Sequence, residues 1–303
     1  MIDICLLGSG GVIPLPNRWL TSLLVKFKGK MLLIDCGEGT QIPLAMTKWG
    51  FKHLDAILFT HYHADHVAGL PGLLLTIGNA GRVVPLTLIG PVGLAETFEG
   101  LTVIAPTLPY AIKLIILPTN YFVEVAFNDI CIKSNPIDHT LPGLAYSIEI
   151  KRQGKFDAMR AKKHNIPVNL WGVLQNGESI TVDDSVITPD MVLGAPRKGI
   201  KLCYCTDSRP TDSMVDFIKD ADLFICEGMY GDQTDASKAV NKKHMLFTEA
   251  AQLAKDGGVK EMWLTHYSPS LKEPELFVEG ARDVFARTVV GTDLLCKRIC
   301  FED

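Results

Sequence analysis

The sequence predicts an α/β protein made of two related halves that pack sheet against sheet. Short aliphatic runs alternate with stretches of helical periodicity along the 303 residues, which is typical of chains built from βα units. No low-complexity tract or Ser/Gly linker divides the chain, and the way the strands end in the first half recurs in the second. These observations favour one continuous domain over residues 1–303.

The predicted strands are short β-branched or aliphatic runs. In chain order they cover residues 2–7, 22–27, 30–34, 56–60, 86–89, 200–205, 223–226 and 261–265. Helices are predicted to begin near residues 39, 67, 92, 212, 248 and 273. The helix near residue 248 is the best marked, because three alanines and a leucine form its apolar face and Gly257-Gly258 ends it.

The same polar residues follow predicted strands in both halves of the chain. Residues 30–34 lead into Asp35, and the next buried run leads into Thr-His-Tyr at 60–62. Much later, residues 200–205 lead towards Asp207, and another run leads into Thr-His-Tyr at 265–267. Each half therefore offers an aspartate and a histidine at strand ends, where open α/β sheets build their sites. The alternative is that βα units simply end in polar residues.

Composition narrows the class of protein. With 47% apolar residues and a net charge of −4, a chain of this length can bury a large core and needs no metal to fold. No apolar run approaches the roughly 18 residues of a membrane span, and the N-terminus lacks the features of a signal peptide. We therefore expect a cytoplasmic protein without a membrane partner, whose eight cysteines are buried free thiols. The acidic balance excludes a diffuse cationic surface for nucleic acid and leaves a local basic patch open.

Four ligand-type residues stand close together directly after a predicted strand: His61, His63, Asp65 and His66. His61 and His63 alternate in extended chain and can point the same way. Asp65 and His66 enter the next helix and can face a second point a few ångströms away. One short loop can therefore hold two metal ions, whereas solubility alone gives no reason for such crowding.

Two ions need more ligands than this loop supplies, so further ligands are expected at other strand ends. The predicted sets are His61, His63 and His139 for one ion and Asp65, His66 and His266 for the other, with Asp207 bridging. These nitrogen and oxygen donors favour zinc and leave manganese or iron open. Two ions roughly 3.5–4 Å apart would turn a bridging water into hydroxide near neutral pH, which is machinery for hydrolysis.

The run at residues 61–66, HYHADH, matches the HxHxDH signature of the metallo-β-lactamase superfamily, and the chain resembles the ribonuclease Z family within it nearly from end to end. Residues 34–41, IDCGEGTQ, are similar to that family's first motif, and His139, Asp207 and His266 fall where its later metal motifs fall. The resemblance implies a four-layer αβ/βα sandwich, two zinc ions per subunit and a homodimer. It also implies that Asp35 orients the metal loop without being a ligand.

The residues that indicate phosphodiester cleavage are not among the predicted metal ligands. Residues 243–251, KHMLFTEAA, resemble the ribonuclease Z segment that carries a histidine, here His244, and Glu227 matches its carboxylate partner. Cleavage expels a poor alkoxide leaving group, which an imidazolium held by a carboxylate can protonate or stabilise. The resemblance implies an endoribonuclease that removes the 3′ trailer from precursor tRNA, with Asp65 orienting or deprotonating the nucleophile.

Residues 151–198 interrupt the second half and begin with the most basic segment of the chain. In ribonuclease Z the corresponding insertion is a projecting arm that grips the tRNA elbow, which implies phosphate contacts by basic side chains. The predicted RNA contacts are Lys151, Arg152, Lys155, Arg160, Lys162 and Lys163. A solvated helix face is the alternative explanation of this charge run.

Two other functions stay open at the level of sequence. Residues 14–19 and 166–171 depart from the ribonuclease Z pattern, which leaves a related hydrolase of a small phosphodiester or ester as the first alternative. The second is a binding protein with a degenerate site. The presence of every expected ligand argues against it, and metal analysis would decide.

Overall fold

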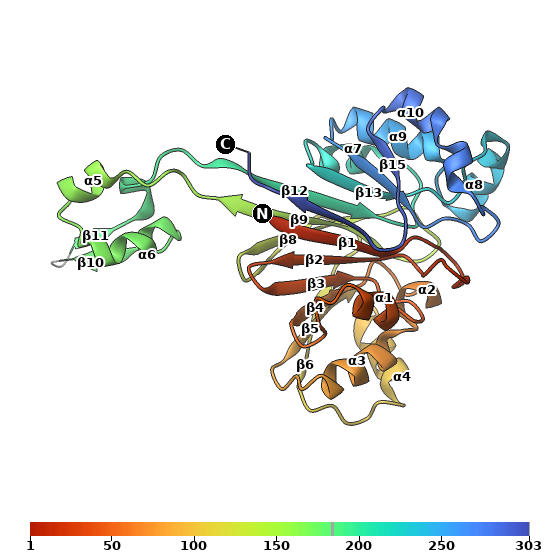
Figure 1. Cartoon of the computed structure of the whole chain (residues 1–303), viewed down its shortest axis with the longest axis horizontal. Coiled ribbons are helices and arrows are strands. Elements are labelled where there is room, and N and C mark those ends of the chain that lie inside the picture. The colour runs from red at the N-terminus through yellow and green to blue at the C-terminus, as the bar shows by residue number, and fades with distance from the viewer. Residues whose placement is uncertain (183–184, 303) are drawn as a thin grey trace.

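The computed structural model describes residues 1–182 and 185–302. Two large sheets lie face to face, and helices cover the outer face of each, so that the chain forms four layers (Figure 1). The α/β fold class and the αβ/βα sandwich predicted from the sequence are confirmed.

Each large sheet has seven strands. The first sheet contains, in spatial order, β16 (Leu295–Ile299), β1 (Ile2–Gly8), β2 (Ser22–Phe27), β3 (Lys30–Ile34), β4 (Leu54–Leu58), β5 (Leu86–Pro91) and β6 (Ile112–Leu117). The second contains β15 (Thr288–Val290), β14 (Met262–Thr265), β13 (Leu223–Glu227), β12 (Arg197–Cys205), β9 (Leu144–Arg152), β8 (Ile130–Pro136) and β7 (Val123–Phe127). Strands β3 to β6 are parallel, and so are β12 to β15. Each sheet therefore has one parallel part whose carboxyl strand ends can carry a site.

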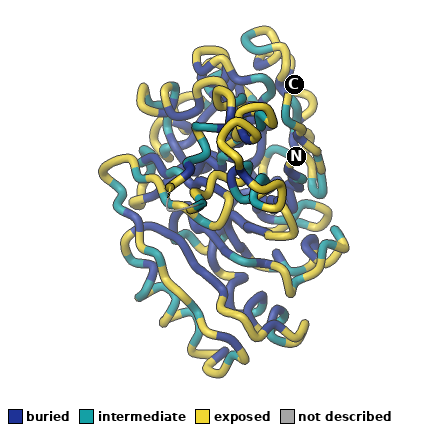
Figure 2. Tube along the Cα trace, turned by 90° about the vertical axis from the view of Figure 1, so that its left-hand side faces the viewer, coloured by how far each residue is buried: buried dark blue, intermediate teal, exposed yellow. Residues whose placement is uncertain are grey.

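Strand β1 shows why these strands read as continuous apolar runs. Ile2, Ile4 and Leu6 point into the core between the two sheets, which also receives side chains of the second sheet. Cys5 and Leu7 point the other way, into the core beneath the outer helices. A strand buried on both faces needs apolar residues at every position, and Figure 2 shows the strands as buried stretches beneath exposed helical turns and loops.

The outer layers consist of short helices. The first sheet carries α1 (Gln41–Met46), α2 (Ala64–Val67), α3 (Leu70–Asn79) and α4 (Leu94–Thr102). The second carries α7 (Asp212–Ile218), α8 (Ala236–Lys242), α9 (Phe247–Asp256) and α10 (Glu279–Val284). Helix α9 packs its Ala250, Ala251, Leu253 and Ala254 face onto the second sheet, which is the face that the sequence indicated.

An arm leaves the second sheet between β9 and β12, where Arg152 and Arg197 form the last paired position. It contains α5 (Ala158–Lys163), α6 (Trp171–Gln175), β10 (Ile180–Val182) and β11 (Ser185–Ile187), and it extends well away from the sheets (Figure 1). Ala161, Leu174 and Val192 lie in a small apolar cluster of the arm's own. The arm therefore has its own packing, separate from the cores of the sandwich.

Some predicted elements differ from the structure. The strand predicted at 56–60 ends at Leu58, and the helix predicted near residue 67 is two helices divided at Ala68-Gly69. A Cβ atom on Gly69 would lie 1.9 Å from the carbonyl oxygen of Gly37, so a close backbone crossing occupies this point. Near residue 273 the chain forms a 3-10 turn, η4 (Pro274–Phe277), before α10 begins.

Several strands were not predicted, among them β16, which pairs with β1 from the far end of the chain. Six of the eight cysteines are buried, but Cys296 and Cys300 are exposed, so the expectation of uniformly buried thiols is wrong for these two. Within residues 1–182 and 185–302, no helix combines the length and the apolar character needed to cross a membrane.

Candidate metal centre

The predicted site residues converge where strands of both sheets end. His61, His63, Asp65 and His66 follow β4 and enter α2, whereas His139, Asp207 and His266 follow β8, β12 and β14. The main chain continues the sheets up to this point, because the amide of Phe59 still donates to Ile89 and the amide of Leu144 donates to Thr60. The strands thus bring distant side chains together.

His61, His63, His139 and Asp207 form the first group, in which one ligand atom from each lies within 4.8 Å of the others. His63 Nδ1 lies 2.9 Å from His61 Nε2 and 3.2 Å from His139 Nε2. Asp207 Oδ2 is 3.7 Å from His61 Nε2 and 3.6 Å from His139 Nε2. Three imidazole nitrogens and one carboxylate oxygen therefore face a common centre.

Asp65, His66 and His266 form the second group. His66 Nε2 and His266 Nε2 lie 3.3 Å apart, and they are 3.5 and 3.4 Å from Asp65 Oδ2. Sequence reasoning did not identify the amide of Val12, which donates to the same Asp65 oxygen over 2.7 Å. This amide orients the carboxylate from a loop of the first half.

Asp207 lies between the two groups. Its Oδ1 is 3.0 Å from His266 Nε2 and 3.3 Å from His66 Nε2, whereas its Oδ2 faces the first group. Burial disfavours its charge, but His266, His66 and His61 hold the pKa of the carboxyl well below its usual range. Oδ1 is buried and accepts no hydrogen bond from the described residues. A buried carboxylate oxygen in this state fits coordination to a cation.

The hydrogen bonds of the rings leave the correct nitrogens facing the centre. Nδ1 of His66 contacts Asp35 Oδ2 at 2.8 Å, and Nδ1 of His139 contacts the carbonyl oxygen of Lys243 at 3.2 Å. Each contact favours a proton on Nδ1, which leaves Nε2 with a free lone pair for a metal ion. The donor set, with histidine nitrogens and carboxylate oxygens, fits divalent cations.

Burial favours the neutral form of the three imidazoles in the first group, which is the form that binds metals. Burial lowers the pKa of His61 well below its ordinary value, and the neighbouring His66 adds to the effect. Burial also lowers the pKa of His63 and of His139. Without a cation these imidazoles are held neutral, which is the form that coordinates metals.

Asp35 is fully buried behind the metal loop. Besides His66, it accepts hydrogen bonds from the amide and the hydroxyl of Thr60, at 2.8 Å from the amide. Burial disfavours the charged ring of His66, but Asp35 and Asp207 raise the pKa of His66 well above its ordinary value. Asp35 thus contacts a ring of the second group and lies outside the ligand groups, and its orienting role stays a prediction.

Backbone conformations at the strand ends are unusual in the same way in both halves. Asp35, Asp207 and His266 have φ angles of 62°, 53° and 58°, in the left-handed region. Non-glycine residues rarely adopt this region, although aspartate and histidine are found there more often than most others. Strained positions of this kind gather at functional sites because the surrounding structure holds them there.

His244 and Glu227 form a pair beside the centre. His244 follows α8 and its Nδ1 lies 3.1 Å from Oε2 of Glu227, the last residue of β13. Burial opposes a charged ring, but Glu227, and further Asp207 and Asp65, raise the pKa of His244 above its ordinary value. The rings of His244 and His266 stack with centroids 5.7 Å apart, which places His244 next to the second group.

The six predicted RNA contacts separate into two places. Arg160, Lys162 and Lys163 lie on α5 in the arm, and Lys155 precedes that helix. Lys151 and Arg152 instead end β9 at the base of the arm.

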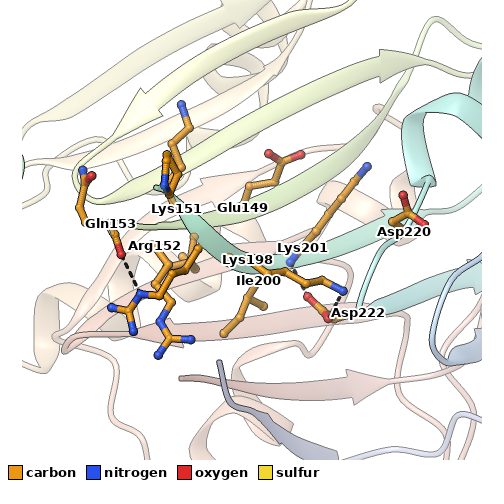
Figure 3. A pocket seen from close by; sticks show the side chains of 13 residues that line it. Glu149, Lys151, Arg152, Gln153, Lys198, Ile200, Lys201, Asp220 and Asp222 are labelled. Carbon is orange, nitrogen blue, oxygen red and sulfur yellow. Dashed lines mark hydrogen bonds and ion pairs between the residues drawn. The ribbon is translucent and has the colours of Figure 1, made fainter. Parts of the chain in front are cut away.

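At the arm base, Lys151 and Arg152 line a cavity of about 370 Å³ together with Lys198 and Lys201 of β12 (Figure 3). Lys198 and Lys201 were not among the predicted contacts. Asp222 also lines this cavity, 4.0 Å from Lys198, so the base of the arm carries both signs of charge.

The chain is 52% identical to the ribonuclease Z of Clostridium kluyveri, and the alignment covers 100% of each chain. This chain belongs to the ribonuclease Z family. The ribonuclease Z of Clostridium acetobutylicum is also 52% identical, again with 100% of both chains covered.

Solved structures support the fold of this ribonuclease Z family member. Human tRNase Z, short form, has a TM-score of 0.69 and 22% identity, over 99% of this chain and 100% of that one. The metallo-β-lactamase fold protein YhfI from Bacillus subtilis has a TM-score of 0.70 and 22% identity, over 98% of both chains. A family model described as anti-Pycsar protein Apyc1 matches residues 2–97, the stretch that contains the HxHxDH signature.

The buried hydrogen bonds of Asp35 generate a prediction about metal affinity. Asp35→Asn replaces the acceptor facing His66 Nδ1 with an amide that presents a donor or a weaker acceptor, so the ring loses its fixed tautomer. We expect zinc affinity to fall about 10- to 100-fold while the fold is retained, as measured by competition with a chromogenic chelator. Asp3→Asn, which removes only an exposed ion pair with Arg298, is the matched control. Unchanged affinity in folded Asp35→Asn protein would contradict the orienting role.

Proposed function

We propose that this ribonuclease Z family member is a metal-dependent endoribonuclease that removes the 3′ trailer from precursor tRNA. The observation that carries the proposal is the pair of ligand groups with Asp207 between them and the His244–Glu227 pair beside them. Such a site suits hydrolysis of a phosphodiester with a poor leaving group. A small phosphodiester or ester as the main substrate is not favoured, because the relatives that match the whole chain are ribonuclease Z proteins.

Two divalent cations, for which zinc is the best candidate, would be held by the two ligand groups. His61, His63 and His139 would hold one and Asp65, His66 and His266 the other, with one oxygen of Asp207 towards each. Bound cations of this kind supply Lewis-acid activation of water and of phosphoryl oxygens. The histidine-rich donor set supports zinc over magnesium or calcium, which prefer oxygen ligands.

The side chains supply the proton transfers. Asp65, oriented by the amide of Val12, would orient the attacking water and accept its proton. His244, held by Glu227, would donate a proton to the ribose 3′ oxygen as the phosphorus–oxygen bond breaks. The products are a tRNA with a 3′ hydroxyl and a trailer with a 5′ phosphate, and general acid–base steps of this kind contribute about 10²- to 10⁴-fold in rate.

The same proposal includes the arm as the RNA-binding region of a single domain. Arg160, Lys162 and Lys163 form a basic turn on α5, and Met159 beside them is exposed. Basic side chains on a projecting element can contact phosphates at a distance from the cut. We also propose, from the family resemblance, a homodimer in the cytoplasm, which sedimentation and cell fractionation would test.

The function is tested with metal-replete protein and a panel of precursor tRNAs. We expect one cut near the discriminator nucleotide, with a 3′ hydroxyl on the tRNA and a 5′ phosphate on the trailer, mapped by sequencing both products. Cleavage of small nitrophenyl diesters without any cut in precursor tRNA would contradict the proposal and support the alternative substrate class.

His244→Ala tests the proposed proton donor. His244 also groups with Asp207 and His266, with ligand atoms within 4.8 Å of one another, but each of the two proposed ions has its ligands without this ring. Metal content should therefore be retained, while cleavage of precursor tRNA should slow about 10²-fold or more. The cleavage rate is measured under single-turnover conditions, and the metal content is measured on the same preparation. His53→Ala removes an exposed histidine elsewhere and should change neither. Full activity of metal-replete His244→Ala protein would exclude the assigned role.

Neutralising α5 tests the arm. Replacing Arg160, Lys162 and Lys163 by alanine should raise KM for precursor tRNA and make the salt dependence of binding shallower, because fewer counterions are released. Cleavage of a nitrophenyl diester should not change. The matched control neutralises the exposed Lys48, Lys52 and Lys113 of the first half. If both triple variants bind precursor tRNA equally well, α5 is only a solvated helix face.

A further inference from the structure

The segment that carries His244 has no regular structure of its own. It lies between α8 and α9, and Lys243 just before it has a φ of 58°, in the left-handed region. Regular structure contributes only the bond from the amide of His244 to Ala239 of α8 and the bridge between Leu246 and Tyr230, which do not by themselves define the position of the ring. Other groups must hold the main chain if the ring is to meet the leaving oxygen in a fixed place.

Every main-chain polar group of residues 244 and 245, and the amide of Leu246, has a partner. The amide of His244 donates to the carbonyl oxygen of Ala239, and the amide of Met245 donates to the carboxylate of Glu227. The carbonyl of Met245 accepts from Tyr230. The remaining two groups, the carbonyl of His244 and the amide of Leu246, depend on a second carboxylate and an arginine.

That arginine is Arg209, two residues after Asp207. Its Nη1 donates to the carbonyl oxygen of His244 at 2.6 Å and to Glu249 Oε2 at 2.8 Å, and its Nη2 donates to Glu249 Oε1. Glu249 Oε2 also accepts from the amide of Leu246 at 2.8 Å. The fork is bidentate, and the Arg209 and Glu249 side chains are only 18% and 28% exposed.

Arg209 is also tied to the metal-binding side. Its amide donates to the carbonyl oxygen of Asp138, the residue before His139. The preceding amide, that of Ser208, donates to Glu227 at 2.5 Å. One short segment therefore links the strand end of Asp207, the loop of His139 and the main chain of His244.

We propose that Arg209, paired with Glu249, is a positioning residue that sets the distance between His244 and the metal centre. It does not touch the reacting atoms, since its guanidinium is committed to Glu249 and to the carbonyl of His244. Lysine at this position would keep the charge but lose the planar fork. The inference rests on the proposed role of His244 as proton donor in the proposed function.

Arg209→Lys is compared on two substrates that differ in their need for a proton donor. Precursor tRNA has an alkoxide leaving group, whereas a nitrophenyl diester releases a stable anion without protonation. We expect kcat on precursor tRNA to fall about 10- to 100-fold, the size expected of a displacement of about 1 Å. KM and metal content should stay unchanged, and the rate on the nitrophenyl diester should change by less than about threefold.

The double variant Arg209→Lys/His244→Ala isolates the route of the effect. If Arg209 acts through His244, the double variant should be no slower on precursor tRNA than His244→Ala alone, because Arg209→Lys then has nothing further to remove. Arg282→Lys is the matched control, because Arg282 also joins a carboxylate, Glu279, and a carbonyl, that of Thr288, on α10 and β15. Glu249→Gln keeps the shape and removes the charge, and it serves as the second variant if Arg209→Lys does not fold.

The outcomes separate the two proposals. Three outcomes would overturn the positioning role of Arg209 alone. They are an equal loss of rate on both substrates, an additive loss in the double variant, and full activity of Arg209→Lys on precursor tRNA while His244→Ala is slow. Full activity of His244→Ala would remove the proposed role of His244, and the positioning inference with it. The positioning role is supported if Arg209→Lys slows only the cleavage of precursor tRNA and has no further effect in the His244→Ala background.

Discussion

The electrostatic contact on which the site depends is that of Asp207 with imidazoles from both halves. Its two oxygens lie 3.0 to 3.7 Å from nitrogens of His61, His66, His139 and His266. A buried carboxylate is costly unless cations or hydrogen-bond donors compensate it. The two sheets must stack in one register for these groups to meet, so the site is a product of the whole sandwich and does not create it.

Three side chains with a proposed role in the site are each held by a partner outside the proposed ligand sets. Asp35 fixes the ring of His66, the amide of Val12 fixes Asp65, and Glu227 fixes His244. These contacts orient side chains before substrate arrives, which lowers the reorganisation needed during reaction. The left-handed backbone at Asp207 and His266 belongs to the same arrangement, since strain there is tolerated only because the surroundings over-determine it.

Much of this arrangement could be predicted from the sequence because it depends on local spacing. The ligand pattern at residues 61–66 lies within one loop, and the repeated strand ends indicate Asp207 and His266 as further ligands. Strand β2 and strand β3 have the predicted bounds, because a hydrophobic run defines each one. The role of each ligand stays a prediction until metal binding is measured.

What the sequence could not predict involves partners far apart in the chain. Arg209 and Glu249 are separated by 40 positions, and β16 joins β1 across nearly the whole sequence. Alternation in β16 is masked by Lys297 and Arg298, so its hydrophobic signal is weak. The six predicted RNA contacts between residues 151 and 163 belong to two places, because strand β9 ends inside this segment and leaves Lys151 and Arg152 at the arm base. Only tertiary packing decides such contacts.

The most direct test of the central claim is the number of zinc ions bound per chain by the reconstituted protein and by its Asp207→Ala variant, measured by native mass spectrometry. Because Asp207 faces both ligand groups, we predict two ions in the unaltered chain and a loss of one or both in the variant that remains folded. Equal stoichiometry in the two proteins, or fewer than two ions in the unaltered chain, would contradict a centre built around Asp207.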